Sequence, residues 1–449
     1  MNMKKLGILL IAGVLLVGNS CQKYLEGINE NPNQATDASL ENLMTSTMVS
    51  FLGYNEGEDA RLVGMWTQQF TGSDRQYAGY NSYIVTTVNF DFFQPYIGVI
   101  QTADLGIVKA DDLGNRVAAG AMKILQGATF GYVASMYGDA PFAEAADFEQ
   151  FPTPKYDSQD AVYAGAIALL AEGIADINSG AGGLPVDIFS MSEAQWVAVA
   201  YSYIARLELH RGNLAAAATA ASNGVALGGD MMGTHGTARE ADRNMWYDFI
   251  VDERSGYLDA DGAYAPRILD PASPDYITDA KTDESARFAF FYNGTYPKYG
   301  ANTNSSGALD DTDVMFGMTS SYPMITYAET QLIIAELAAN SNRAGALTAL
   351  NNVRAELQTK FPTGQYDAYV DADLPGSALM DAIVLEKYKS LIGQSEAFSD
   401  MNRLGNPFGL SPTTGTSLPQ RFLYPQGEVN SNPNVPDPLP GLFDPLPAN

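Results

Sequence analysis

The chain has 449 residues, and its 52 acidic side chains outnumber its 25 basic ones, which gives a formal net charge of −27 at pH 7. Nucleic acids and anionic lipid surfaces are bound through clustered lysine and arginine side chains, so this charge argues against both kinds of partner. The length allows two or three domains, although a single large helical array also reaches this size.

The chain begins with an export signal. Lys4 and Lys5 precede an apolar stretch, Leu6 to Val17, which is followed by small residues and Cys21. The stretch is shorter than the roughly 20 residues that a membrane-spanning helix needs, so residues 1–20 are predicted to be a secretory signal peptide.

Cys21 is the only cysteine in the sequence, so it forms no internal disulfide. Its place directly after the signal predicts lipoprotein processing, in which its thiol is acylated and anchors the protein to a membrane. An ordinary signal peptide with an incidental cysteine is the alternative, because Gly18 stands where a lipobox usually has an aliphatic residue.

Apolar residues recur at helical spacing over most of the first half of the chain. The pattern predicts helices beginning at Asp37 and spanning Arg61–Phe70, Val117–Met136, Ser158–Ile177, Ser192–Gly212 and Leu214–Leu227. Ser192 and Gln195 form a capping box at the start of the fifth of these helices. Within it, Trp196, Val199, Ala200 and Tyr203 match the spacing of a tetratricopeptide repeat, in which a large and a small residue let two helices pack closely.

A second group of helices is predicted nearer the C-terminus. Thr326 and Glu329 form another capping box, which opens a helix to Ala339, and helices over 343–358 and 378–391 follow. The helical repeats therefore cover about 37–227 and 326–393.

The region between these groups, about 228–320, is rich in Gly, Asp, Tyr and Asn and has weak periodicity. It is longer than an ordinary connection, so it is predicted to be a loop-rich insertion or a functional surface. The Pro- and Asn-rich tail, 419–449, is expected to run extended over the surface.

The sequence holds no recognisable catalytic constellation. His210 lies at the end of a predicted helix, where it would complement the macrodipole, and His235 has no neighbour at metal-ligand spacing. Asp310, Asp311 and Asp313 offer ligands for a structural calcium ion, but a solvated acidic turn is the favoured interpretation, so no cofactor is predicted. Paired carboxylates for glycoside hydrolysis stay open, since 52 acidic residues provide many pairs.

Aromatic residues stand out in the middle region. Tyrosine and tryptophan faces stack on sugar rings and peptide side chains at low entropic cost. The candidate ligand-binding residues are Trp246, Tyr247, Tyr292, Tyr296 and Tyr299. The alternative is that these rings form the small core of the middle region itself.

Five segments resemble, in the same order, characteristic segments of the SusD/RagB-like outer-membrane lipoproteins. They are CQKYLEGINENPNQAT, SMYGDAPFAEA, SYPMITYAETQLIIAEL, LEKYKSLIGQSEAFSDMNRLGNP and RFLYPQGEVNSNPN. Two positions depart from the family pattern, because Phe398 stands where Trp is frequent and Asn402 replaces an arginine.

The resemblance implies one SusD-like domain over residues 21–449, mostly α-helical, with about four tetratricopeptide-like helix pairs and an irregular part that carries the ligand surface. It implies a non-enzymatic lipoprotein on the outer face of the outer membrane. Such a protein binds a nutrient oligomer, glycan in preference to peptide, and delivers it as a lid to a SusC-like TonB-dependent barrel transporter. The repeat side is then expected to pack on the transporter.

Two other functions are consistent with the residues themselves. One is a surface-anchored glycoside hydrolase, which the missing catalytic constellation disfavours. The other is a helical-repeat scaffold that binds only protein, which the aromatic middle region disfavours.

Overall fold

The structure is a computed structural model that describes residues 38–304 and 313–447. The predicted signal peptide, Cys21, Asp310 and Asp311 lie outside the described residues. Most of the regular structure is helical, and the strands are two to four residues long. The expectation of a mostly α fold is confirmed.

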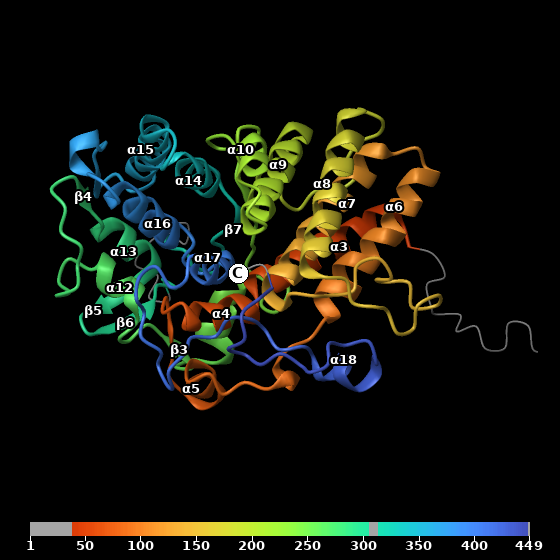
Figure 1. The fold of residues 1–449 in the computed structure, drawn as a ribbon, viewed down its shortest axis with the longest axis horizontal. Coiled ribbons are helices and arrows are strands. Elements are labelled where there is room, and N and C mark those ends of the chain that lie inside the picture. The colour runs from red at the N-terminus through yellow and green to blue at the C-terminus, as the bar shows by residue number, and fades with distance from the viewer. Residues whose placement is uncertain (1–37, 305–312, 448–449) are drawn as a thin grey trace, which may run out of the picture.

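The helices form two adjoining groups, which meet where α10 packs against α14 (Figure 1). The first group contains α3 (Leu40–Glu56), α6 (Thr102–Asp112), α7 (Arg116–Tyr137), α8 (Gln159–Asn178), α9 (Glu193–His210) and α10 (Leu214–Ala221). The second contains α14 (Tyr327–Ala338), α15 (Arg343–Lys360), α16 (Ala378–Ser390) and α17 (Glu396–Arg403). In the described part of the chain, α3 packs on α6, α7 on α8, α9 on α10 and α14 on α15, so the expected helix pairs are present.

Glycines let α7 and α8 approach closely. A Cβ added to Gly120 would lie 2.7 Å from the carbonyl oxygen of Gly173, and one added to Gly173 would lie 2.7 Å from that of Gly120. Two turns further along, a Cβ on Gly127 would lie 2.7 Å from the carbonyl oxygen of Ala166. These two helices therefore pack backbone to backbone, as a small residue in a helix pair permits.

The start of α9 has the geometry that its sequence predicts. The Gln195 N–H donates to Ser192 Oγ at 3.3 Å, and the Ser192 N–H donates to Gln195 Oε1 at 2.9 Å. Trp196 and Tyr203, two of the repeat positions, are buried. The indole N–H of Trp196 donates to Asp187 Oδ2 at 2.9 Å, which satisfies the only polar group of that buried ring.

The start of α14 departs from its predicted capping box. The Glu329 N–H does donate to Thr326 Oγ1, at 3.1 Å. The Glu329 carboxylate, however, pairs with Arg206 of α9 at 2.6 and 2.7 Å instead of reaching back to the cap. An ion pair with a distant helix therefore takes the place of the hydrogen bond that the Glu329 side chain would make to the Thr326 N–H in a capping box.

Short strands attach the middle region to the rest of the molecule. β1 (Thr71–Gly72) pairs with β3 (Leu258–Asp259), β2 (Met231–Gly233) with β7 (Tyr322–Ile325), β4 (Thr282–Asp283) with β8 (Gln365–Tyr366), and β5 (Tyr292–Thr295) with β6 (Lys298–Ala301), all antiparallel. Only the last pair is a local hairpin. The region also holds α11 (Met245–Tyr247), α12 (Tyr264–Leu269) and α13 (Ser285–Phe291). It is thus joined to the helical groups at three places.

Several elements have no clear periodic signal in the sequence. These are α6, α17, and a wide helical turn over 93–101. The pattern over Arg61–Phe70 corresponds to α4 (Glu58–Trp66), which is followed by α5 (Arg75–Asn81). Helix α10 ends at Ala221 rather than near Leu227, because a turn through Asn223 and Gly224 follows it.

The C-terminal tail has one short helix, α18 (Gln426–Ser431), and is otherwise irregular. It does not lie only on the surface, since Phe422 has no exposed area. The Phe422 ring packs 5.7 Å from Trp66 and 6.2 Å from Phe398, and its N–H donates to the Met136 carbonyl at 2.7 Å. The tail therefore helps to build the core, because Phe422 is buried among α4, α7 and α17.

Within the described residues, none of the helices is both long enough and apolar enough to pass through a lipid bilayer.

Candidate ligand-binding site

Four of the five aromatic residues singled out from the sequence are buried. Trp246 is 0% exposed, Tyr292 1%, Tyr299 4% and Tyr247 9%, whereas Tyr296, next to the tip of the β5–β6 hairpin, is 43% exposed. The Trp246 ring packs 4.9 Å from Phe70 and 4.7 Å from Phe316.

The hydroxyls of the two buried tyrosines in the hairpin are also engaged. Tyr292 donates to the Gln69 carbonyl at 3.0 Å, and Tyr299 donates to Asp270 Oδ2 at 2.8 Å. Of the five candidate residues, only Tyr296 therefore has an exposed ring on which a ligand could stack. The binding role assigned to the five residues stays a prediction, and burial favours the alternative that four of them form the core of the middle region.

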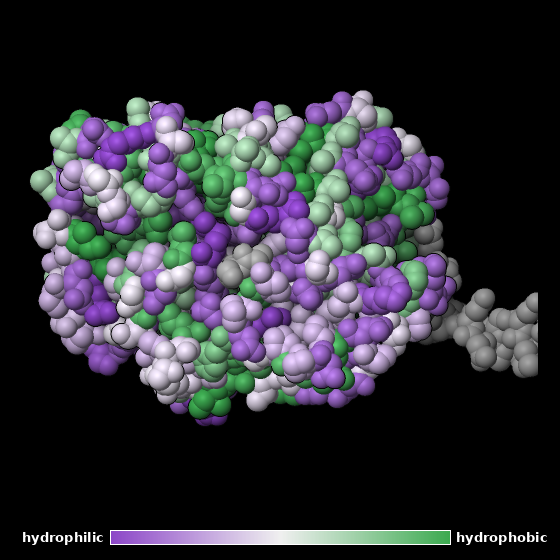
Figure 2. Space-filling view, viewed as in Figure 1, coloured by the Kyte–Doolittle hydropathy of each residue, from purple (hydrophilic) through white to green (hydrophobic). Residues whose placement is uncertain are grey.

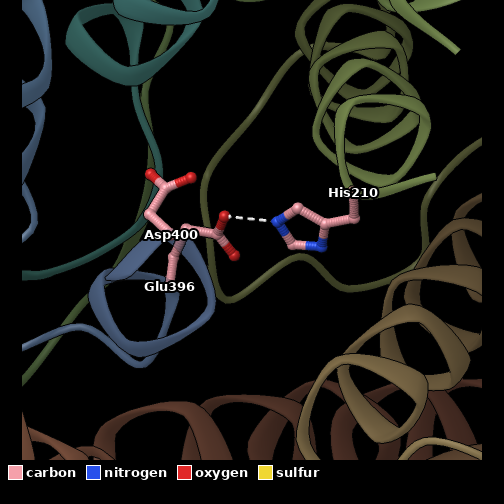
Figure 3. Close-up of side chains that lie close together, drawn as sticks. All are labelled: His210, Glu396 and Asp400. Atoms are coloured by element: carbon pink, nitrogen blue, oxygen red, sulfur yellow. Dashed lines mark hydrogen bonds and ion pairs between the residues drawn. The ribbon is translucent and has the colours of Figure 1, made fainter. Parts of the chain in front are cut away.

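A cluster of buried ionisable side chains lies where α9 and α17 meet. His210, Glu396 and Asp400 each place a potential metal-ligand atom within 4.8 Å of the others. Figure 3 shows the Glu396 carboxylate turned towards the His210 ring, and their 2.8 Å contact is through Nε2. The other ring nitrogen, Nδ1, lies 3.2 Å from Ser135 Oγ. His210 lies in the last turn of α9, and its two ring nitrogens also connect that helix to α17 and α7.

Positive side chains already neutralise both carboxylates of this cluster. Asp400 pairs with Lys387 and with Arg403, at 2.7 Å in each case, and Glu396 lies 3.6 Å from Arg206. Burial opposes ionisation of Asp400, but Lys387 and Arg403 outweigh it and hold the pKa of that carboxyl well below its usual range. These charges form a structural ion network that ties α9, α16 and α17 together. They leave no vacant carboxylate for a metal ion.

The other histidine is paired as well. His235 Nε2 lies 2.9 Å from Glu56 Oε2, and the Glu56 side chain is fully buried. Burial lowers the pKa of His235, but the Glu56 carboxylate more than reverses this and raises it above its ordinary value. Asp313, the described member of the acidic turn, is exposed.

A groove of about 500 Å³ opens near the C-terminal end of the described chain. Its lining consists of Gly405, Asn406, Leu410, Pro412, Thr416, Ser417, Leu418, Gln420, Phe443 and Pro445. None of these residues is charged, although the chain as a whole has a charge of −27. Phe443 is 47% exposed, and its ring packs edge to face against Tyr83 at 6.1 Å.

The groove loop, residues 405–420, is held in shape by its own hydrogen bonds. The Asn406 side chain accepts from the Leu410 N–H at 2.9 Å and donates to the Leu410 carbonyl at 3.0 Å. Gly405 and Gly409 take positive φ values of 66° and 61°, which glycine adopts without steric cost. Residues 406–410 thus form a closed turn.

The groove loop is also bound to the chain around α5. Gln68 Nε2 donates to the Ser411 carbonyl at 2.6 Å, and the Thr413 N–H donates to Tyr83 Oη at 3.0 Å. The tail joins from the other side, where the Gln420 N–H donates to the Leu442 carbonyl at 2.9 Å. Three segments that are far apart in the sequence therefore build one surface.

Backbone strain occurs in and around the groove loop. Eight non-glycine residues of the described chain have positive φ, and three of them lie in this loop or hydrogen-bond to it: Gln68 (56°), Tyr83 (61°) and Asn406 (56°). Such conformations persist only where surrounding contacts enforce them, and they cluster at binding and catalytic sites. Asn406 itself lines the groove, so its strained conformation is a second feature, besides the shape, that favours a binding role for the groove.

The groove lining matches the chemistry of an uncharged, hydroxyl-rich ligand. Amides (Asn406, Gln420) and hydroxyls (Thr416, Ser417) offer neutral donors and acceptors, and Phe443 offers a ring for stacking. Hydropathy does not mark this site, because its lining mixes polar and apolar residues. Polar and apolar residues are likewise interspersed over the face of the molecule shown in Figure 2. The sequence of the loop, GNPFGLSPTTGTSLPQ, reads only as a turn-rich connection.

Comparison with known proteins defines the family. The model of the SusD-like family described as "Starch-binding associating with outer membrane" matches residues 32–425. The chain therefore belongs to this family of outer-membrane-associated, nutrient-binding proteins. No curated protein sequence matches the chain.

Solved structures share the fold at low sequence identity. A SusD/RagB family protein from Bacteroides thetaiotaomicron is 16% identical, with a TM-score of 0.63, covering 89% of this chain and 95% of the other. A SusD homologue from Bacteroides fragilis is 18% identical, with a TM-score of 0.64, covering 88% and 94%. A chitin-binding SusD homologue from Flavobacterium johnsoniae is 15% identical, with a TM-score of 0.62, covering 87% and 94%.

Proposed function

We propose that this protein captures an uncharged oligosaccharide in the groove beside Phe443 and presents it to a SusC-like TonB-dependent transporter. The observation that carries the proposal is the neutral, amide- and hydroxyl-lined groove with an exposed aromatic ring. Sugar hydroxyls need neutral donors and acceptors, and the C–H face of a sugar ring packs on an aromatic face.

Charge supports an uncharged ligand over an anionic one. A chain with a net charge of −27 repels uronic or sulfated sugars at long range, and the groove offers no basic residue to offset that repulsion. A neutral glycan is not repelled by the net charge and needs no basic residue in the groove.

The relatives support a glycan in preference to a peptide. The Flavobacterium johnsoniae homologue, and another solved structure of 18% identity and TM-score 0.64, are both named as chitin-binding. Peptide capture is the second candidate within the same class of function.

The groove supports binding rather than hydrolysis. Glycoside hydrolases use two carboxyl groups that flank the scissile bond, and the groove lining holds none. We therefore propose that the protein is not an enzyme.

The proposed location rests on Cys21 and on the family. Lipid attachment at Cys21 leaves residues 22–35 as a tether, which at about 3.3–3.6 Å per extended residue reaches some 45–50 Å. A tether of that length allows the body to open and close over a barrel on the outer face of the membrane. The helical repeats would then face the transporter.

Titration calorimetry tests the groove. Wild-type protein is titrated with a panel of neutral oligosaccharides and their uronic-acid counterparts, and then the best ligand is titrated into Phe443→Ala and Phe93→Ala. Loss of the stacking ring should weaken binding roughly threefold to tenfold, on the order of 0.5–1.5 kcal/mol. Phe93 is 67% exposed and lies outside the groove, so Phe93→Ala is the matched control.

Three results would contradict the proposal. Equal affinity for neutral and uronic ligands would contradict the neutral-ligand argument, and unchanged affinity of Phe443→Ala would remove the ring from the site. Release of reducing sugar by the purified protein would revive the hydrolase alternative.

A further inference from the structure

A second pocket lies between α13, β7 and α15, and it shares no lining residue with the groove. Its volume is about 80 Å³, several times the roughly 10–15 Å³ that one water molecule needs. It therefore has room for a group of a few heavy atoms. We call it the α15 pocket and define its polar side by Asp230, Glu356 and Lys360.

Glu356 brings an unsatisfied acceptor to this pocket. Its Oε2 atom is buried and has no hydrogen-bond partner among the described residues. Burial, followed by the nearby Asp230 carboxylate, raises the pKa of Glu356 to about 7. An unpaired buried carboxyl oxygen of this kind carries a desolvation cost that a ligand's donor would relieve.

Lys360 brings a donor that Glu356 does not use. A glutamate four residues before a lysine on a helix ordinarily pairs with it, yet Glu356 Oε2 has no hydrogen-bond partner among the described residues. The Lys360 ammonium instead lies 4.5 Å from the centre of the Phe290 ring and 5.5 Å from that of Phe361. The carboxyl and the ammonium therefore both line the pocket without forming an ion pair with each other.

The other two charged side chains that line the pocket are engaged elsewhere. Asp230 Oδ1 accepts from the Tyr327 N–H at 2.7 Å, and Arg287 pairs with Glu386 at 2.6 Å. The remaining wall is largely apolar and includes Phe291, Met315 and Ile392. A suitable ligand therefore carries one donor and one acceptor a short distance apart, with an apolar remainder.

We propose that the α15 pocket binds a secondary amide, whose N–H donates to Glu356 Oε2 and whose carbonyl accepts from Lys360 Nζ. A zwitterion offers the same two contacts, but burying two formal charges against apolar walls costs far more than burying a neutral amide. The amide can come from the acetamido group of an N-acetylated sugar or from a peptide bond, and these two sources share the chemistry of the site.

Methyl-labelled NMR spectra of the mature protein at pH 8 test the proposal, with Met315 and Ile392 as reporters inside the pocket. The probes are N-methylacetamide, di-N-acetylchitobiose, cellobiose and a blocked glycine dipeptide. Saturable shifts of both reporters are expected with N-methylacetamide and with at least one of the two larger amides, which identifies the source. Cellobiose lacks the amide and should leave both reporters unmoved.

Three variants establish which side chains are responsible. Glu356→Leu and Lys360→Met should each weaken binding at least about tenfold, since each removes a hydrogen bond to a charged group. Glu356→Gln keeps an acceptor oxygen and should retain most of the affinity. Thr359→Leu, an exposed position on the same helix, is the control and should bind as wild type does.

Reporter shifts with cellobiose equal to those with chitobiose would overturn the proposal. So would wild-type affinity in both Glu356→Leu and Lys360→Met, or silence of both reporters with every amide. None of these results bears on the groove, because Phe443 is not part of this pocket.

Discussion

Arg206 and Glu329, 123 residues apart in the sequence, form a two-pronged ion pair in which Arg206 Nε and Nη2 donate to the two carboxylate oxygens at 2.7 and 2.6 Å. The Arg206 side chain is 12% exposed, and that of Glu329 is fully buried. The pair joins α9 to α14, so it connects the two helical groups that flank the middle region. It shares Arg206 with Glu396 and hence with the ion network around Asp400.

Breaking this pair should strongly destabilise the protein. Arg206→Met leaves the buried Glu329 carboxylate without a partner, which is expected to lower the free energy of unfolding by about 3–5 kcal/mol. Arg206→Met combined with Glu329→Leu should restore a large part of that loss, because no unpaired charge then remains. Urea denaturation followed by circular dichroism gives both values.

The matched control is Arg75→Met, since Arg75 is a largely exposed arginine beside Asp74. It should change stability by no more than about 0.5 kcal/mol. If Arg75→Met and Arg206→Met lowered the free energy of unfolding equally, the buried pair would contribute no more to stability than an exposed arginine does.

Asp59 predicts how stability depends on pH. Its carboxyl accepts from Tyr132 Oη at 2.5 Å, and burial raises its pKa from 3.8 to about 7. Between these two pH values the folded chain binds a proton that the unfolded chain has lost, so stability falls as the pH rises from about 4 to about 7 and this contribution is level above that.

Asp59→Asn removes this titration, so the decline in stability over that range should become shallower, and the variant should gain stability relative to wild type towards pH 8. Unfolding midpoints measured at several pH values give the slope. Asp112→Asn, at an exposed position at the end of α6, is the control. An unaltered slope in Asp59→Asn would mean that other groups set the pH dependence.

The variant Trp246→Ala distinguishes a role of Trp246 in the core from a role in ligand binding. Because the indole is fully buried against Phe70 and Phe316, Trp246→Ala should lower the free energy of unfolding by about 3–5 kcal/mol. Oligosaccharide affinity, measured at a temperature where the variant is still folded, should be unchanged. A variant of wild-type stability with weakened ligand binding would restore Trp246 to the ligand site.

Cys21 predicts where the protein is found in the cell. Cys21→Ser removes the thiol that acylation requires, so the folded protein should leave the membrane fraction and appear in soluble form. Fractionation and immunoblotting measure this, with the unaltered protein as reference. Retention of Cys21→Ser in the membrane fraction would show that another contact holds it there.

The strongest elements could be predicted from local patterns. Helix α7 extends from Arg116 to Tyr137, one residue beyond the predicted span at each end, because an uninterrupted 3.6-residue apolar period leaves little choice of structure. The capping box at Ser192 is present with both of its hydrogen bonds for the same local reason. The strands were not predictable, since they are two to four residues long and three of the four described pairs join residues more than eighty positions apart.

The ligand site could not be predicted from the same signals. Aromatic residues in a loop-rich segment look alike whether they face a ligand or a core, and the contacts of Trp246 with Phe70 and Phe316 are decided by residues far from it in the sequence. The groove could not be predicted either, because its segments carry no distinctive sequence signal. Its lining comes from one turn-rich loop and from the tail around Phe443, supported by the chain around Tyr83, and none of these segments alone has the composition of a site.

The sequence by itself determined the helix pairs, the predicted export signal with Cys21, and a net charge that disfavours anionic partners, because each of these is written in local spacing or in composition. Only the tertiary structure decided which aromatic residues are accessible, that His210 belongs to an ion network, and that an uncharged groove opens on an acidic protein. Accessibility and ion pairing depend on which distant segments meet, and long-range packing settles that.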